Sequence, residues 1–178
     1  VEFLYEPLAA GLDFETKLES DKCVLVVDIG GGTTDCSIVN MGPQRQNKID
    51  RQGAFLAHTG KRIGGNDLDI HLAFKQLMPL FGMDGQFKSG ITLPRKPFWN
   101  AVSINNLVEQ SEFYSKSNVL SLQQMQRDAA KSIHLTRLLK LQKTKQNHRL
   151  VRLAELAKID LSDNALSESD LSFIEADL

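Results

Sequence analysis

An apolar stretch runs directly into glycines, hydroxyls and carboxylates in VLVVDIGGGTTDCSIV, residues 24–39. Three consecutive glycines let the backbone turn tightly and leave its N–H groups unshielded, so that several of them can converge on phosphate oxygens. Thr33 and Thr34 add hydroxyl donors. Asp28 and Asp35 flank the turn and would repel a phosphate directly, so they become useful when Mg²⁺ or water lies between. The turn therefore predicts a nucleotide–Mg²⁺ site.

The alternative interpretation is a glycine-rich hairpin whose aspartate only caps its own turn. A tight hairpin seldom needs three glycines, which favours the nucleotide site. The stretch is neither of the two common phosphate-binding loops, because no Gly-Lys-Ser/Thr follows it and the next element is predicted to be a strand rather than a helix. We therefore expect a strand–turn–strand phosphate clamp.

The elements that would position this turn follow from periodicity and from turn residues. Pro7 suits the first turn of a helix, and Asn66 suits the N-cap of another. Strands are predicted over 1–5, 23–28, 33–40, 51–58 and 171–177. Helices are predicted over 7–13, 67–78, 100–116, 121–143 and 147–159, with a loop over 79–98.

Composition narrows the classes of partner. The chain has 178 residues and a formal net charge of −1, which gives no global attraction to nucleic acid or acidic membranes. No apolar run approaches the roughly 18 residues that a membrane helix needs. Cys23, Cys36 and the four histidines have no metal-ligand spacing. We expect a reduced, cytoplasmic protein with neither a nucleic-acid nor a membrane partner.

Four segments in a fixed order carry a resemblance to a known family. The strand–turn–strand at DIGGGTTD resembles the second phosphate motif of the actin-like ATPase superfamily. YEPLAAG (5–11), IGGNDLD (63–69) and AELAKIDLS (154–162) resemble the NEPxAA, LGGEDFD and AExAKxxLS segments of DnaK-type heat-shock chaperones. The resemblance implies an α/β fold, the actin-like ATPase (ribonuclease-H-like) lobe two, with a mixed-sheet hairpin and a helix-rich second subdomain.

The resemblance also implies that ATP or ADP binds with Mg²⁺ at the matching positions. Asp28 and Glu6 would be the catalytic carboxylates and would act through Mg²⁺ or its waters. The nucleotide-binding positions would be Gly30, Gly31, Gly32 and Thr33 at the phosphates, Gly64 and Gly65 beneath the phosphates or ribose, and Glu155, Lys158 and Ser162 at the ribose and adenine.

Each of these positions also has a structural interpretation. Glu6 could simply favour the positive end of its helix. The glycine pair at 64–65 could be only a strand-to-helix turn. Glu155 and Lys158 could be a solvated i,i+3 pair. The functional interpretation therefore rests on the whole set of motifs.

The chain also departs from the family pattern. The first phosphate loop and the catalytic lysine of lobe one are missing, so we expect a fragment that is inactive alone. Residues 1–63 would be part of the phosphate-binding subdomain (IIA-like). Residues 64–178 would be a helix-rich subdomain (IIB-like) with an insertion at about 79–150. That insertion resembles the YegD-like branch, in which the ATPase domain occurs without the usual peptide-binding domain.

Charge is unevenly distributed near the C-terminal end. Residues 127–158 hold nine Lys or Arg and two acids, while residues 160–178 hold six acids and no Lys or Arg. The basic helices could bind a protein partner or could be a solvated face. Their lack of aromatic residues disfavours nucleic acid.

The sequence thus predicts a nucleotide-switched, chaperone-like ATPase, with the rest of the ATPase domain (lobe one) as its first partner. Two alternatives belong to the same superfamily: a filament-forming MreB/actin-like ATPase and a small-molecule kinase. The long insertion disfavours the filament, since it would obstruct regular filament contacts.

Overall fold

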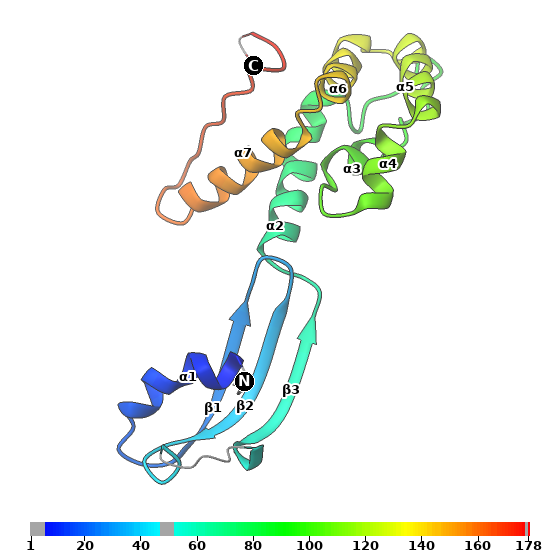
Figure 1. Ribbon diagram of the computed structural model, residues 1–178. Coiled ribbons are helices and arrows are strands. Elements are labelled where there is room, and N and C mark those ends of the chain that lie inside the picture. The colour runs from blue at the N-terminus through cyan, green and yellow to red at the C-terminus, as the bar shows by residue number, and fades with distance from the viewer. Residues whose placement is uncertain (1–5, 47–51, 177) are drawn as a thin grey trace. The chain divides into compact units, whose positions relative to one another are not determined.

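The computed structural model describes residues 6–46, 52–176 and 178. It divides into two compact units, Val1–Asp67 and Leu68–Leu178, which are described separately here (Figure 1). The strand predicted over residues 1–5 lies outside the described residues. The predicted boundary at residues 63–64, between a phosphate-binding subdomain and a helix-rich subdomain, is not tested by this division and remains a prediction.

The first unit is a three-stranded antiparallel sheet with one long helix. Its elements are α1 (Glu6–Thr16), β1 (Lys22–Ile29), β2 (Thr34–Met41), a short 3₁₀ helix (Gln52–Ala54) and β3 (Phe55–Lys61). The strand order is β1-β2-β3, and both pairs are antiparallel, so the described sheet is not the mixed sheet that was predicted. The β1–β2 hairpin runs from the pair Lys22 and Met41 to the pair Ile29 and Thr34, so the glycines form its tip.

The strand predictions agree with this sheet except at the third strand. The strands predicted over 23–28 and 33–40 are confirmed to within one residue at each end. The strand predicted over 51–58 begins instead at Phe55, because the backbone just before it forms the 3₁₀ helix. The helix predicted over 7–13 is longer at both ends.

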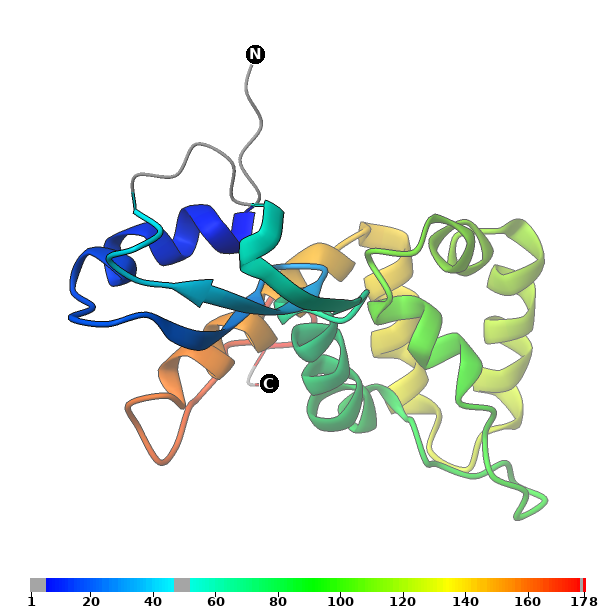
Figure 2. The same ribbon diagram turned by 90° about the horizontal axis from the view of Figure 1, so that it is seen from below.

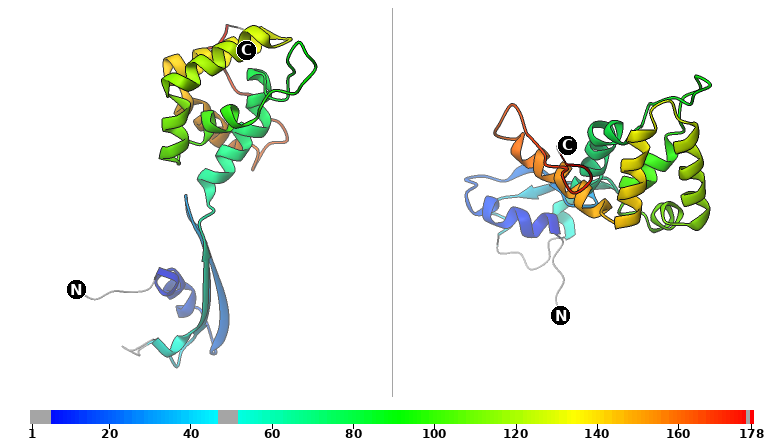
Figure 3. Two further views of the ribbon diagram at one scale, coloured as in Figure 1. Left: turned by 90° about the vertical axis from the view of Figure 1, so that its right-hand side faces the viewer. Right: turned by 90° about the horizontal axis from the view of Figure 1, so that it is seen from above.

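The two faces of the sheet differ because side chains alternate along each strand. One face carries a small core of Val39, Met41 and Ala54, with Val24 and Val26 packed against it. Helix α1 lies over this face (Figure 2; Figure 3, left). On the opposite face four large apolar side chains are exposed: Leu25, Val27, Ile29 and Ile38.

The second unit is a helical domain with the larger core. A helical run begins with α2 (Gly65–Leu72), which starts in the first unit, and continues as a π-helix (Ala73–Leu77) and a 3₁₀ helix (Met78–Phe81). Five further helices follow: α3 (Lys96–Val102), α4 (Leu107–Phe113), α5 (Lys116–Asp128), α6 (Ser132–Thr144) and α7 (Asn147–Asp160). α5 and α6 lie side by side (Figure 3, right). The core includes the fully buried side chains of Phe81, Phe98, Phe113, Leu138 and Leu141.

Two of the predicted helices are each broken into two. The helix predicted over 100–116 is divided between α3 and α4, where Asn106 caps α4 by accepting from the backbone N–H groups of Val108 and Glu109. The helix predicted over 121–143 is divided between α5 and α6. There the N–H of Ala130 donates to the carbonyl of Gln86 at 2.9 Å, which a continuous helix would not allow.

The remaining differences lie at the ends of elements. The helix predicted over 67–78 begins at Gly65, so Asn66 is inside its first turn rather than at its N-cap. The loop predicted over 79–98 is shorter, because α3 already begins at residue 96. The strand predicted over 171–177 is wrong for its described residues, which form turns that bury Leu171 and Ile174 three positions apart. Residue 177 lies outside the described residues.

Candidate functional site

The glycine turn at the tip of the β1–β2 hairpin is bonded to the start of α2. The Gly30 N–H donates to the Thr33 carbonyl at 2.9 Å and closes the tip. The carbonyls of Gly30 and Gly31 accept from the N–H groups of Gly65 and Asn66 at 2.9 and 2.8 Å. The structure therefore brings the two predicted phosphate segments, 30–33 and 64–65, into direct contact.

Gly64 is the glycine on which this contact depends. A Cβ at Gly64 would lie 2.6 Å from the carbonyl oxygens of Gly30 and Gly31, which are backbone atoms with little freedom to move. Its N–H donates to Asp67 Oδ2 at 2.9 Å. Thr34 Oγ1 strengthens the contact by donating to the Ile63 carbonyl at 2.7 Å. The packing of the two segments thus explains why residue 64 has no side chain.

The fold gives no such reason for the glycines of the turn itself. None of Gly30, Gly31 and Gly32 has a positive φ. A Cβ at Gly32 would meet nothing within 4 Å, and at the other two positions it would make only ordinary contacts. Both Gly31 and Gly32 are exposed, and their N–H groups donate to no acceptor in the described part of the chain. The space above the turn is therefore open, and two donors face it unused.

Two carboxylates lie opposite each other beside this turn. Asp28 on β1 pairs in register with Asp35 on β2, and both side chains are half-buried. Asp35 Oδ1 lies 3.7 Å from His58 Nε2, and His58 Nδ1 shares a hydrogen bond of 2.9 Å with Ser37 Oγ. The side chain of Asp28 has neither an ion pair nor a hydrogen bond with any other described residue. Asp35 is thus held by its own sheet, whereas Asp28 is available for a ligand.

Glu6 makes no contact with these carboxylates in the described structure. It is the exposed first residue of α1, which starts over the middle of the sheet and runs toward the end opposite the glycine turn (Figures 1 and 2). Within the described ranges, no interaction joins Glu6 to Asp28. The proposed metal role of Glu6 therefore has no support from direct contact between the two carboxylates.

The predicted ribose and adenine residues belong to the second unit, at the end of α7. Glu155 forms an ion pair with Arg152, and Lys158 Nζ lies 2.7 Å from Asp69 Oδ1. Ser162, just beyond the helix, donates from Oγ to the Lys158 carbonyl at 3.3 Å. Glu155 and Lys158 therefore have separate partners, so the solvated i,i+3 pair considered from the sequence is not formed.

Two polar residues next to the motifs carry contacts that the sequence did not predict. Asn66 places its side chain beside Gly31, with Nδ2 3.4 Å from the position of a Cβ there. Asp69 is only 4% exposed. In the sequence, Asp69 stands between the apolar residues Leu68 and Ile70 in a predicted helix. Aspartate is seldom buried, so this position was the one sequence feature that could have pointed to Asp69.

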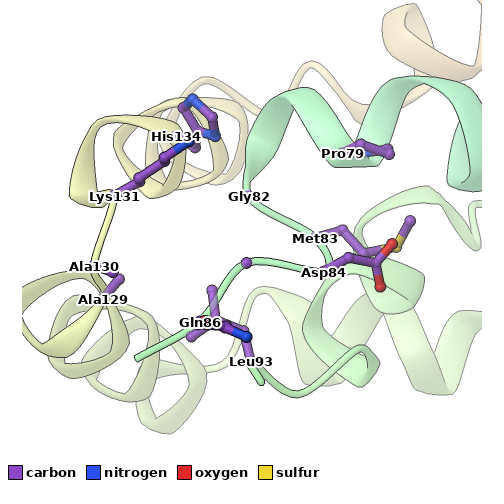
Figure 4. A pocket seen from close by; sticks show the side chains of 11 residues that line it. Pro79, Gly82, Met83, Asp84, Gln86, Leu93, Ala129, Ala130, Lys131 and His134 are labelled. Carbon is purple, nitrogen blue, oxygen red and sulfur yellow. The ribbon is translucent and has the colours of Figure 1, made fainter. Parts of the chain in front are cut away.

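A separate cavity of about 350 Å³ opens in the second unit and includes none of the predicted nucleotide residues (Figure 4). Lys131 and His134 are among its lining residues. Burial lowers the pKa of His134, and the charges of Arg137 and Lys131 lower it further. No group of three or more His, Cys, Asp and Glu side chains gathers as a metal site in the part of the chain that is described.

Comparison with known proteins identifies the segment that contains the turn. The profile of the Hsp70 protein family matches residues 3–81. Residues 3–81 are therefore similar to part of an Hsp70 protein. A protein described as a chaperone protein HscA homolog from Acinetobacter baylyi (strain ATCC 33305 / BD413 / ADP1) is 42% identical over 84 residues. That alignment covers 42% of this chain and 12% of the Acinetobacter protein. No solved structure gives a significant match.

The Hsp70 match includes three of the four motifs. Residues 3–81 contain the EPLAAG segment, the glycine turn and the GGNDLD segment, so the actin-like ATPase fold is implied for this part. The AELAKIDLS segment lies outside the match, and its assignment rests on the resemblance of its own residues. No described helix is long and apolar enough to cross a membrane.

Proposed function

We propose that this chain supplies the phosphate-binding half of lobe two in an Hsp70-type, nucleotide-switched chaperone ATPase. The observation that supports this is the open space at Gly32, next to two exposed N–H groups that have no acceptor in the described residues. Backbone N–H groups in a glycine turn are suited to phosphate oxygens, because no side chain keeps the phosphate away. ATP or ADP is the ligand that the family match favours.

The carboxylates divide into two roles in this proposal. Asp28 would act on Mg²⁺ or its waters, because its carboxylate has no other partner in the described structure and lies beside the turn. Mg²⁺ commonly binds proteins through one or two carboxylates and keeps several waters. Asp35 would support the turn through its contact with His58. Glu6 would contribute only through water.

The uncovered edge and face of the sheet support the proposal that this unit is only part of a lobe. In the described residues β1 has a strand neighbour on one side only, and large apolar side chains such as Leu25 and Ile29 are exposed on the uncovered face. Edge strands and contiguous apolar faces of this kind are usually covered in stable proteins. We propose that lobe one and the remainder of lobe two are the first partners, and that the chain alone does not hydrolyse ATP.

The inserted helices remain a second proposed contact surface. Lys143 and Lys145 near the end of α6 are exposed, whereas Arg137 and Lys140 of the same helix contact the C-terminal segment at Glu175 and Ile174. A protein partner with an acidic surface would fit this end of α6.

Two matched glycine variants test the phosphate site. In both Gly32→Ala and Gly53→Ala the new Cβ would meet nothing within 4 Å, and neither glycine has a positive φ. We expect Mg²⁺–ADP to bind the chain weakly, in about the millimolar range. Gly32→Ala should weaken binding at least about tenfold, because the methyl would occupy the phosphate position, while Gly53→Ala should not change it.

The measurement is a two-dimensional NMR titration of the ¹⁵N-labelled chain with Mg²⁺–ADP. The amide signals of Gly31 and Gly32 should shift most. Equal binding by the two variants, or shifts confined to other residues, would show that the turn does not hold the phosphates. Hydrolysis of ATP by the chain alone, seen in a phosphate-release assay, would contradict the predicted inactivity.

A further inference from the structure

The cavity in the helical domain is enclosed by two chain segments that the backbone holds together. Its volume is about 350 Å³, and all of its lining residues belong to the second unit. It opens between the segment 82–86 and the link from α5 to α6, residues 129–131 (Figure 4). The N–H of Ala130 donates to the Gln86 carbonyl at 2.9 Å and joins these two walls. Both the fixed walls and the volume are typical of a site for a small molecule.

Part of the lining is apolar and buried. Met83 and Leu93 are each 4% exposed, and Ala129 is 2% exposed. Pro79 adds a further apolar side chain to the lining. Surface of this kind favours the hydrocarbon part of a ligand, because contact with it removes apolar area from water. A small hydrated ion alone would leave the same surface wet. The lining therefore favours a ligand that has an apolar body.

The polar part of the lining carries unpaired positive charge. The side chains of Lys131, His134 and Gln86 form neither a hydrogen bond nor an ion pair with any described residue. Asp84 is the one acidic residue in this described lining, and its Oδ1 already lies 3.1 Å from Arg95 Nε. The charge left to act on a ligand is therefore the ammonium of Lys131, which would attract an anion.

The surroundings of His134 have the same sign of charge. Burial lowers the pKa of His134, and the charges of Arg137 and Lys131 lower it further, while Glu175 acts in the opposite direction. Glu175 is itself held in an ion pair with Arg137. Figure 4 shows the side chain of Lys131 extending toward the His134 ring. An anion at this place would meet the ammonium and could also accept a hydrogen bond from a ring N–H.

We propose that this cavity binds a small organic carboxylate with an apolar body. The carboxylate pairs with Lys131 and accepts a hydrogen bond from His134. The hydrocarbon part packs against Met83 and Leu93. The site uses none of the residues proposed for the nucleotide, so this inference holds whether or not the proposed function does.

The test compares three six-carbon probes that differ only in their polar end: hexanoate, 1-hexanol and hexylammonium. Each is titrated at neutral pH into the ¹⁵N-labelled 178-residue chain and followed by two-dimensional NMR. We expect hexanoate to bind with a Kd of about 1 mM. The other two should bind at least about fivefold more weakly, because neither makes a charge-assisted hydrogen bond with the ammonium. The amide signals of Gly82, Gly85 and Ala130 should shift most.

Two matched lysine variants test the charge contact. Lys131→Gln removes the ammonium of the lining and should weaken hexanoate binding at least about threefold, with no change for 1-hexanol. Lys143→Gln removes an exposed ammonium from the same helix outside the lining, and it should change neither. Both lysines are exposed, so both variants should fold, which thermal melts would check.

A third variant tests the cavity itself. Ala130 is exposed and lines the cavity, so Ala130→Leu should fill part of it and weaken hexanoate binding at least about tenfold. Inorganic phosphate, which has charge but no apolar body, should cause no comparable shifts.

Each part of the proposal can fail by itself. Equal binding of hexanoate and hexylammonium, or equal hexanoate binding by Lys131→Gln and the unaltered chain, would overturn the assignment to a carboxylate. Shifts from phosphate as large as those from hexanoate would overturn the requirement for an apolar body. Absence of hexanoate binding, or unchanged binding by Ala130→Leu, would overturn the site.

Discussion

At the scale of single residues, Gly32 and Gly64 carry no side chain for different reasons. Gly64 is required by the fold, because its Cβ would collide with two backbone carbonyls, whereas Gly32 faces open space. Gly64→Ala should therefore lower the free energy of unfolding of the first unit by about 1–3 kcal/mol, as overpacked positions do. Gly32→Ala should change it by less than about 0.5 kcal/mol. Urea denaturation measures both, and an equal loss in the two variants would contradict this division.

Asp28 is the second residue at which stability and binding should separate. It lies directly opposite Asp35, and like charges in that position repel. Asp28→Asn should therefore raise the free energy of unfolding by about 0.2–1 kcal/mol. The same change should weaken Mg²⁺-dependent ADP binding, because a ligand for the metal or its waters is lost. Thermal melts and ADP titrations with Mg²⁺ or with EDTA would test both effects. Asp163→Asn, an exposed site in the other unit, is the control.

His134 gives the helical domain a dependence on pH. Burial and the charges of Arg137 and Lys131 lower its pKa below the usual value of 6.5, while Glu175 acts in the opposite direction. A group whose pKa is lower in the folded state binds fewer protons there, so stability is fully present above about pH 6.5 and is lost as the pH falls. We expect the free energy of unfolding of the second unit to fall between pH 7.5 and 5.5. His134→Gln should reduce that fall more than His148→Gln does, and equal slopes would contradict the assignment.

At the scale of elements, the basic helices and the acidic C-terminal segment contact each other. Arg137 pairs with Glu175, Lys140 Nζ donates to the Ile174 carbonyl at 2.6 Å, and the Arg149 guanidinium lies 4.2 Å from the ring centre of Phe173. These three basic residues therefore have partners within the chain, although Lys140 and Arg149 are also exposed to solvent. The uneven charge distribution seen in the sequence is partly neutralised inside the chain.

This contact predicts unequal effects of charge reversal within α6. Lys140→Glu should destabilise the second unit by about 1–3 kcal/mol, because a partly buried carbonyl loses a charged donor and an acidic segment gains a like charge. Lys143→Glu, one turn away, should change it by only about 0–1 kcal/mol, because Lys143 is exposed and has no contact with the described residues of the C-terminal segment. Thermal melts at low and high salt would show whether the difference is electrostatic. Equal destabilisation by both variants would show that the C-terminal segment is not held through Lys140.

The elements also show what sequence patterns can and cannot predict. β1, β2 and the turn between them were predictable, since alternation and glycines are local signals. The break between α5 and α6 was not, because it depends on a backbone hydrogen bond from Ala130 to Gln86, which is distant in sequence. The contact of Gly64 with the turn could be expected only from family resemblance. The pairing of Asp69 with Lys158 had no local signal, because it joins two helices.

At the scale of the whole molecule, the two units have very unequal cores. The first unit buries only Val39, Met41 and Ala54 in its cluster, whereas the second buries a far larger set that includes Phe81 and Phe98. Domains with so little buried apolar surface are marginally stable alone. We expect two unfolding transitions, with the first unit unfolding at the lower urea concentration. Hydrogen exchange should be faster throughout β1–β3 than in α6, and one cooperative transition seen by both probes would contradict this.

The carbonyls that the glycine turn gives to α2 also determine how its amides point. No peptide bond in the described chain is cis, so the C=O and N–H of one peptide unit point in opposite directions. Since the Gly30 and Gly31 carbonyls point at the start of α2, the N–H groups of Gly31 and Gly32 must point away from it. Each of these two peptide units therefore links the helix on one side to the open space on the other. An anion on the open side would polarise both units and strengthen the bonds to Gly65 and Asn66. Binding of an anion at the glycine turn would then affect the start of α2 without moving it. The effect would be measured as slower hydrogen exchange at the amides of Gly65 and Asn66.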